Sequence, residues 1–164
     1  QRAFIPKRFT YSILRRLHSD SERVLVPSVS MLNELKKYDF KNLVVWNRGV
    51  DTELFNPNKR DTNSKDRQLT YVGRVEIEKN IEEFLKLKGN YNKTVVGDGP
   101  ELQKYINKYP EINFVGVKTG DELAKYYANA DVFVFPSKSD TLGNVILEAL
   151  ASGCLLYTSP SPRD

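Results

Sequence analysis

Short apolar runs alternate with amphipathic segments along most of the chain. After residue 68, runs rich in Val, Phe, Tyr and Ile recur, and each is followed by a polar turn and then by apolar residues at helical spacing. This alternation predicts an α/β fold in which a parallel sheet is covered by helices. The predicted strands are 69–72, 93–96, 112–115 and 131–135, and the predicted helices lie near 78–88, 100–109, 120–129 and 143–151.

Several residues define where these helices begin and which face they bury. Pro100 suits the first position of its helix. Thr119 and Glu122 have the spacing of a capping box, in which each side chain reaches the backbone of the other residue. In the last helix the pattern predicts four buried side chains, namely Val145, Leu147, Ala149 and Leu150.

The first part of the chain has a different character. Residues 2–16 mix Arg and Lys with aromatic and aliphatic residues, which is typical of a basic helix on anionic lipid or, more often, of a surface helix with one packed face. Residues 23–26 and 42–46 are predicted strands. Ser28 is expected to cap the helix between them, whose apolar face contains Val29, Leu32 and Leu35.

The polar run KRDTNSKDRQ indicates a linker between domains. We therefore assign residues 1–60 to the end of one domain and its linker, and residues 61–153 to a second domain. The last eleven residues, CLLYTSPSPRD, resemble a translated transposon-type sequencing adapter, so residues 154–164 are expected to be a non-native tail. Because the start has no initiator Met or signal-peptide core and the end resembles an adapter, the chain is expected to be truncated at both ends.

Composition narrows the class of protein. The chain is 40% apolar and 28% charged, as in soluble globular proteins, and no apolar run is long enough for a transmembrane helix. One histidine (His18) and one cysteine (Cys154) exclude a zinc cluster and a disulfide framework, and this usage fits a reducing cytoplasm. The net charge of +4 suits an anionic ligand, but the basic residues are too dispersed for nucleic-acid binding.

Polar and glycine-containing turns follow the four predicted strands. In parallel folds ligands bind beyond the carboxyl ends of the strands, so these turns are the predicted site. Arg74 and Lys79, five residues apart, can hold a pyrophosphate from two sides, although both also fit solvated surface charges. The turns are Gly73-Arg74, Gly97–Pro100, Gly116–Thr119 and Ser137–Gly143.

Two carboxylates, Asp140 and Glu148, lie at the last turn and in its helix. On a continuous helix they would be about 12 Å apart, whereas glycosidase carboxylates are separated by roughly 5 to 9.5 Å. They therefore suit the two ends of a long, hydroxyl-rich ligand, or else a helix cap and a part-buried acid that needs a partner. The Gly97-Asp98-Gly99 run lacks the third glycine of a dinucleotide motif, which disfavours an NAD-dependent oxidoreductase.

Five segments together resemble the retaining glycosyltransferases of family four, which have the two-domain GT-B fold with Rossmann-like sheets and helices on both faces. SDTLGNVILEALASG and VVWNRGVDTELF are most similar to a bacterial branch of GDP-mannose-dependent α-mannosyltransferases. The segments are 23–35, 44–57, 69–85, 95–105 and 121–153.

The resemblance implies roles for individual residues. Arg74 and Lys79 would hold the donor diphosphate and stabilise the leaving nucleoside diphosphate. Asp140 would contact hydroxyls of the donor sugar, at a position where the family usually has Glu, and Glu148 would bind the ribose. Arg74, Lys79 and Asp140 are thus the predicted catalytic residues. The other predicted donor-binding residues are Gly73, Gly97, Gly99, Val117, Thr141, Leu142 and Gly143.

The resemblance also implies an activity. A hexosyltransferase of this kind moves a sugar, here expected to be mannose, from a GDP- or UDP-sugar to a lipid or glycan acceptor with retention of configuration. No cofactor, metal or protein nucleophile is expected, and the setting is the cytoplasm at the inner face of a membrane, with peripheral attachment. The fragment alone is expected to be inactive. A non-catalytic module that binds nucleotide-sugars, and less readily an NAD oxidoreductase, stay open as alternatives.

Overall fold

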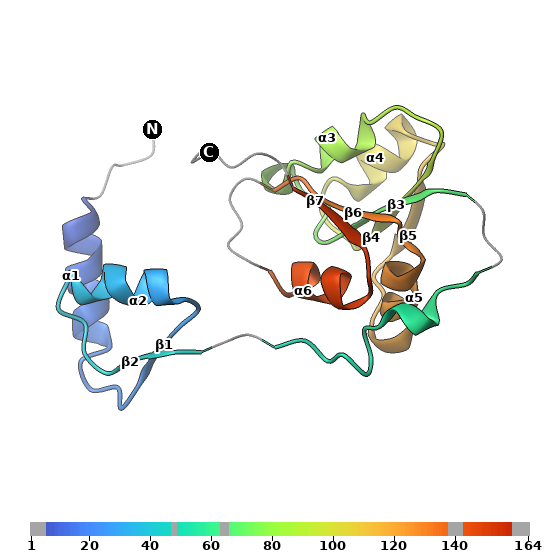
Figure 1. Ribbon diagram of the computed structural model, residues 1–164. Coiled ribbons are helices and arrows are strands. Elements are labelled where there is room, and N and C mark those ends of the chain that lie inside the picture. Colours follow the sequence, from blue (N-terminus) through green and yellow to red (C-terminus); the bar gives the residue numbers. More distant parts are fainter. Residues whose placement is uncertain (1–5, 47–48, 63–65, 138–142, 159–164) are drawn as a thin grey trace. The chain divides into compact units, whose positions relative to one another are not determined.

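The computed structural model describes residues 6–46, 49–62, 66–137 and 143–158. The chain divides into two compact units, Gln1–Arg48 and Gly49–Asp164 (Figure 1). Within the described residues, no helix is both long and apolar enough to cross a membrane.

In residues 6–46, the described part of the first unit, there are two helices and two parallel strands. Its second helix begins as the sequence predicts, because the Ser28 hydroxyl accepts a hydrogen bond from the backbone N–H of Met31 at 3.1 Å. The strands pair in parallel from Val24 opposite Leu43 to Val26 opposite Val45. The elements are α1 (Lys7–Leu17), β1 (Val24–Val26), α2 (Val29–Lys36) and β2 (Leu43–Val45).

Helix α1 contacts α2 and carries an exposed apolar stripe, and none of its residues is buried. Lys7 and Tyr11 both donate hydrogen bonds to Glu34 on α2, at 3.1 and 3.2 Å. The stripe is 47% to 72% exposed and consists of residues four apart, Phe9, Ile13 and Leu17. The surface position agrees with the interpretation of this segment as a surface helix, but only Tyr11 is part-buried, and contact of the stripe with lipid stays a prediction.

The second unit is built on one parallel sheet whose strand order is β5-β4-β3-β6-β7. The strands are β3 (Gln68–Val72), β4 (Asn92–Val96), β5 (Asn113–Gly116), β6 (Val132–Phe135) and β7 (Leu155–Thr158). The α-helices are α3 (Ile81–Leu85), α4 (Leu102–Lys108), α5 (Gly120–Asn129) and α6 (Asn144–Ala151), and two 3-10 turns are η1 (Pro57–Lys59) and η2 (Ile77–Lys79).

Both faces of this sheet are buried, which explains why the central strands are apolar at consecutive positions. Figure 1 shows α3 and α4 on one side of the sheet and α5 and α6 on the other. The side facing α3 and α4 contributes Tyr71, Val95 and Val134 to one core. The side facing α5 and α6 contributes Val72, Val96 and Phe133 to the other.

The second unit begins at Gly49, twelve residues before the boundary at residue 61 that the sequence indicated. Phe55 belongs to the core under α5 and α6 and is only 7% exposed. Lys59 forms an ion pair with Asp121 on α5. Residues 49–60 are therefore packed onto the second unit rather than forming a free linker.

The helix predicted near 78–88 is shorter and interrupted. Asn80 has a left-handed backbone with φ of 53°, which separates the 3-10 turn η2 from the five-residue helix α3. The helix predicted from Pro100 begins at Leu102 instead, and Pro100 lies in the preceding turn.

Two predicted side-chain arrangements are also wrong. Thr119 precedes α5 but makes no capping hydrogen bond, and Glu122 pairs instead with Lys118 at 2.6 Å. In α6, Ile146 rather than Leu150 is buried with Ala149, and Leu150 is 51% exposed. Val145 and Leu147 are partly buried.

The end of the described chain joins the sheet. Strand β7 pairs with β6 from Leu155 opposite Val132 to Thr158 opposite Phe135, and Cys154 lies in the adjacent core. The adapter-derived origin of residues 154–164 concerns where they come from, and it stays a prediction.

Candidate functional site

All five strands of the second unit are parallel, so their carboxyl ends lie at one edge of the sheet. Chain order along the sheet reverses direction between β3 and β6, which creates a topological switch point between these neighbours. Ligands of doubly wound sheets bind at such a point. Gly73 and Arg74 follow β3 at this edge, Gly97 and Gly99 follow β4, and Val117 follows β5.

The loops after β3 and β4 touch through their backbones. A Cβ atom added to Gly97, whose φ is +139°, would lie 2.0 Å from the carbonyl oxygen of Gly73. One added to Gly99 would lie 2.3 Å from the carbonyl oxygen of Val75. The Val75 N–H also donates to the carbonyl of Asp98 at 2.9 Å. These glycines therefore permit close packing of two loops, while their predicted role in donor binding stays a prediction.

The loop after β3 carries the two predicted phosphate-binding cations. Arg74 is 70% exposed and pairs with Glu76 at 3.2 Å. Its carbonyl oxygen accepts a hydrogen bond from the Tyr71 hydroxyl at 2.8 Å, which anchors the loop to the core. Lys79 is part-buried at the end of η2. Both side chains thus lie on one loop at the switch point. Their position is compatible with binding a phosphate and also with being solvated surface charges.

This loop is also joined to the end of β6. Asn80 donates from its side-chain amide to the carbonyl oxygen of Pro136 at 3.3 Å. Asn tolerates a left-handed backbone better than most residues, which suits it to this turn. Asn80 had no predicted role, although a lone Asn between a Lys and an apolar helical run is a signal for such a turn.

Glu148 has the partner that a part-buried acid requires. Its Oε2 accepts a hydrogen bond from the Tyr127 hydroxyl at 2.9 Å. Tyr127 is fully buried on α5, where its ring packs at 5.7 Å from that of Phe55 and 5.6 Å from that of Phe133. Burial, together with the nearby carboxylate, raises the pKa of Tyr127 far above its usual value, so the hydroxyl remains a donor. Sequence reasoning missed Tyr127, because only the tertiary fold brings α5 beside α6.

The remaining predicted residues are placed only in part. Asp140, Thr141 and Leu142 lie outside the described residues. Gly143 has an extended backbone and immediately precedes α6, so the first turn of this helix begins at Asn144. Among the residues that the structure describes, no group of three or more His, Cys, Asp or Glu side chains is arranged to hold a metal ion.

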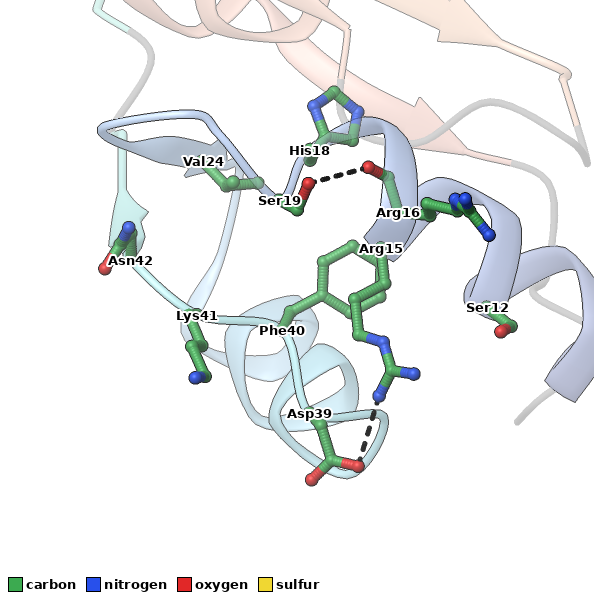
Figure 2. A pocket seen from close by; sticks show the side chains of 10 residues that line it. All are labelled: Ser12, Arg15, Arg16, His18, Ser19, Val24, Asp39, Phe40, Lys41 and Asn42. Carbon is green, nitrogen blue, oxygen red and sulfur yellow. Dashed lines mark hydrogen bonds and ion pairs between the residues drawn. The ribbon is translucent and has the colours of Figure 1, made fainter.

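A cavity of about 570 Å³ lies in the first unit (Figure 2). It borders the amino ends of β1 and β2 at Val24 and Asn42, rather than the carboxyl ends. Arg15 pairs across it with Asp39 at 3.4 Å. Its charges are thus partly neutralised, and the carboxyl edge of the second unit remains the better candidate.

Comparison with known proteins identifies the family. The family described as "Glycosyl transferases group 1" matches residues 66–162, which include the whole five-stranded sheet. The chain belongs to the group 1 glycosyl transferases.

Curated group 1 relatives include enzymes of the mannosyltransferase branch. The chain is 34% identical to the GDP-mannose-dependent alpha-mannosyltransferase of Corynebacterium glutamicum, over 85% of this chain and 36% of that protein. It is 37% identical to the sulfoquinovosyl transferase SQD2 of Arabidopsis thaliana, over 87% of this chain and 31% of that protein. The chain thus spans about a third of the length of these relatives, and the branch named from the sequence is confirmed as one that it resembles.

Solved structures confirm the GT-B fold that the sequence predicted. Sucrose-phosphate synthase from Thermosynechococcus elongatus superposes with a TM-score of 0.76 over 94% of this chain and 45% of that one, at 22% identity. HepE of Anabaena, in complex with UDP-glucose, superposes with a TM-score of 0.72 over 95% of this chain and 50% of that one, at 15% identity.

Proposed function

We propose that the complete protein is a retaining hexosyltransferase that uses a nucleotide-sugar donor. The observation that carries this proposal is the position of Arg74 and Lys79 on one loop at the switch point of a group 1 glycosyl transferase sheet. Charge develops on the departing nucleoside diphosphate during glycosyl transfer, and fixed cations at that position stabilise it. In this proposal both cations hold the diphosphate.

The other site residues take complementary roles in the proposal. Glu148, oriented by Tyr127, accepts hydrogen bonds from the ribose hydroxyls of the nucleotide. Asp140 contacts the donor sugar, and the turn at 141–143 presents backbone N–H groups to it. Gly97, Gly99 and Val117 lie near the base. No metal, cofactor or protein nucleophile enters this mechanism.

We propose GDP-mannose as the first donor to test, because mannosyltransferases named for this donor occur repeatedly among the relatives, at 32% to 34% identity. UDP-sugars are the second choice, since HepE is solved with UDP-glucose. A lipid or glycan acceptor is proposed because the relatives include an alpha-monoglucosyldiacylglycerol synthase of Streptococcus pneumoniae. The exposed stripe and basic residues of α1 further support action at the inner membrane face.

Calorimetric titration of GDP, UDP and NAD into the chain tests this proposal. We expect binding of GDP or UDP and none of NAD. Lys79→Ala should weaken nucleoside diphosphate binding by about 2 kcal/mol, or roughly thirtyfold, as expected for a charge-assisted contact. Lys88→Ala removes the same charge from an exposed residue before the amino end of β4, and serves as the control. Selective NAD binding, or unchanged affinity in a folded Lys79→Ala variant, would contradict the proposal.

A further inference from the structure

Two buried hydroxyl oxygens in the second unit, Ser137 Oγ and Ser152 Oγ, have no hydrogen-bond partner among the described residues. Buried polar atoms are nearly always paired in folded proteins, because an unpaired one has lost its water without compensation. Each unpaired hydroxyl therefore requires an explanation.

The two serines lie at opposite edges of the sheet. Ser137 follows the carboxyl end of β6, which ends at Phe135, and so lies at the switch point. Ser152 follows α6 and precedes the amino end of β7 at Leu155. Because the strands are parallel, only Ser137 shares an edge with the loop that carries Arg74 and Lys79.

A direct link connects Ser137 to that loop. The carbonyl oxygen of Pro136, the residue before Ser137, accepts the side-chain amide hydrogen bond of Asn80. Asn80 in turn follows Lys79. This contact holds the Ser137 segment against the end of the cation-bearing loop.

We propose that the Ser137 hydroxyl donates a hydrogen bond to a diphosphate oxygen of the bound donor. This inference rests on the proposed function, because it adds a ligand to the same site. A hydroxyl supplies one donor and no charge, so it orients an anionic oxygen that Arg74 and Lys79 neutralise. The hydroxyl is buried and unpaired without ligand, so a bound phosphate oxygen would supply the partner that it lacks.

The test compares Ser137→Ala with Ser152→Ala, since both remove a buried unpaired hydroxyl and only one lies at the site. Each variant of the chain is melted without ligand and then titrated with inorganic pyrophosphate, GDP and UDP. We expect both variants to melt at or above the temperature of the parent. Ser137→Ala should bind pyrophosphate and the preferred nucleoside diphosphate about tenfold more weakly, with the same factor for both ligands. This is the loss expected when one hydrogen bond to a charged group is removed. Ser152→Ala should bind both like the parent.

Three results would overturn the inference. Parent-like affinity in Ser137→Ala would mean that something other than the diphosphate satisfies this hydroxyl. Weaker binding of the nucleotide with unchanged pyrophosphate affinity would place the contact elsewhere on the ligand. Equal losses in both variants would show a general effect of the fold. Failure of the proposed function is distinguishable, because the parent chain itself would then bind no nucleoside diphosphate.

Discussion

The hydrogen bond between Tyr127 and Glu148 offers a direct test of how the fold prepares its site. Tyr127→Phe removes the hydroxyl that donates to Glu148 at 2.9 Å and keeps the ring that packs against Phe55 and Phe133. The substitution removes only the hydroxyl oxygen from this fully buried side chain. We therefore expect the ring to keep its place in the core.

The size of the effect follows from the partner and its exposure. A hydrogen bond to a charged group contributes about 1.5–3 kcal/mol to stability. The Glu148 side chain is only partly buried, so water replaces some of the lost contact. We therefore expect the free energy of unfolding to fall by about 1.5 kcal/mol, at the lower end of that range. Nucleoside diphosphate affinity should fall about fivefold, because the carboxylate that would meet the ribose is no longer oriented.

The assay is urea unfolding followed by circular dichroism, with Glu148→Gln and the double variant completing a double-mutant cycle. Tyr126→Phe is the matched control, because Tyr126 packs against the same core and the hydroxyl of Tyr127 is the one that donates to Glu148. A coupling energy of about 1 kcal/mol between residues 127 and 148 is expected. A coupling near zero, or equal destabilisation by Tyr126→Phe, would refute the idea that Tyr127 holds Glu148 in place.

Three further outcomes follow from the described contacts. Above pH 10 the unfolded chain loses the Tyr127 proton while the folded chain keeps it, so unfolding free energy should fall with pH, and less steeply in Tyr127→Phe; identical slopes would contradict this. Gly97→Ala should destabilise the chain by about 3 kcal/mol in urea unfolding, because its methyl group meets the Gly73 carbonyl, whereas Gly116→Ala, with open space around it, should cost about 1 kcal/mol. Burial raises the pKa of Cys154 to about 11, so iodoacetamide at pH 8 should modify the folded chain at least about tenfold more slowly than the urea-unfolded chain; equal rates would mean that the thiol is accessible.

Much of the sheet could be predicted from the sequence, because its strands are short, apolar and bounded by glycine or polar turns. The predicted run 131–135 corresponds to β6 at Val132–Phe135, and Ser28 caps α2 as expected. Local chemistry determines such features, so a single sequence suffices to place them.

Features set by tertiary contacts were not predicted. The polar run after Phe55 indicated a linker, yet burial of Phe55 and the ion pair of Lys59 with Asp121 attach the segment to the second unit. The residue type of Asn80 is a weak local signal for a left-handed backbone, and the apolar spacing around it outweighed that signal, so the helix predicted there was too long. Ile146 rather than Leu150 is buried, because the face of α6 that packs depends on the position of α5.

The candidate site likewise has features that the local sequence predicts and features that only tertiary contacts determine. The turns at the carboxyl ends of the strands followed from the alternation of strands and helices. The hydrogen bonds from Tyr127 to Glu148 and from Asn80 to Pro136 join elements that are distant in the chain, and only the folded structure reveals them.

The interlocked loops after β3 and β4 have a consequence for how the protein folds. Arg74 lies on the first loop, but the shape of that loop depends on backbone contacts with Gly97 and Asp98 across the sheet. The two loops meet only once β4 has paired with β3, so the position of the cation depends on residues that follow it by more than a full helix in the chain. Ribosomal synthesis must therefore release residues well beyond Gly99 before this part of the site takes its final form.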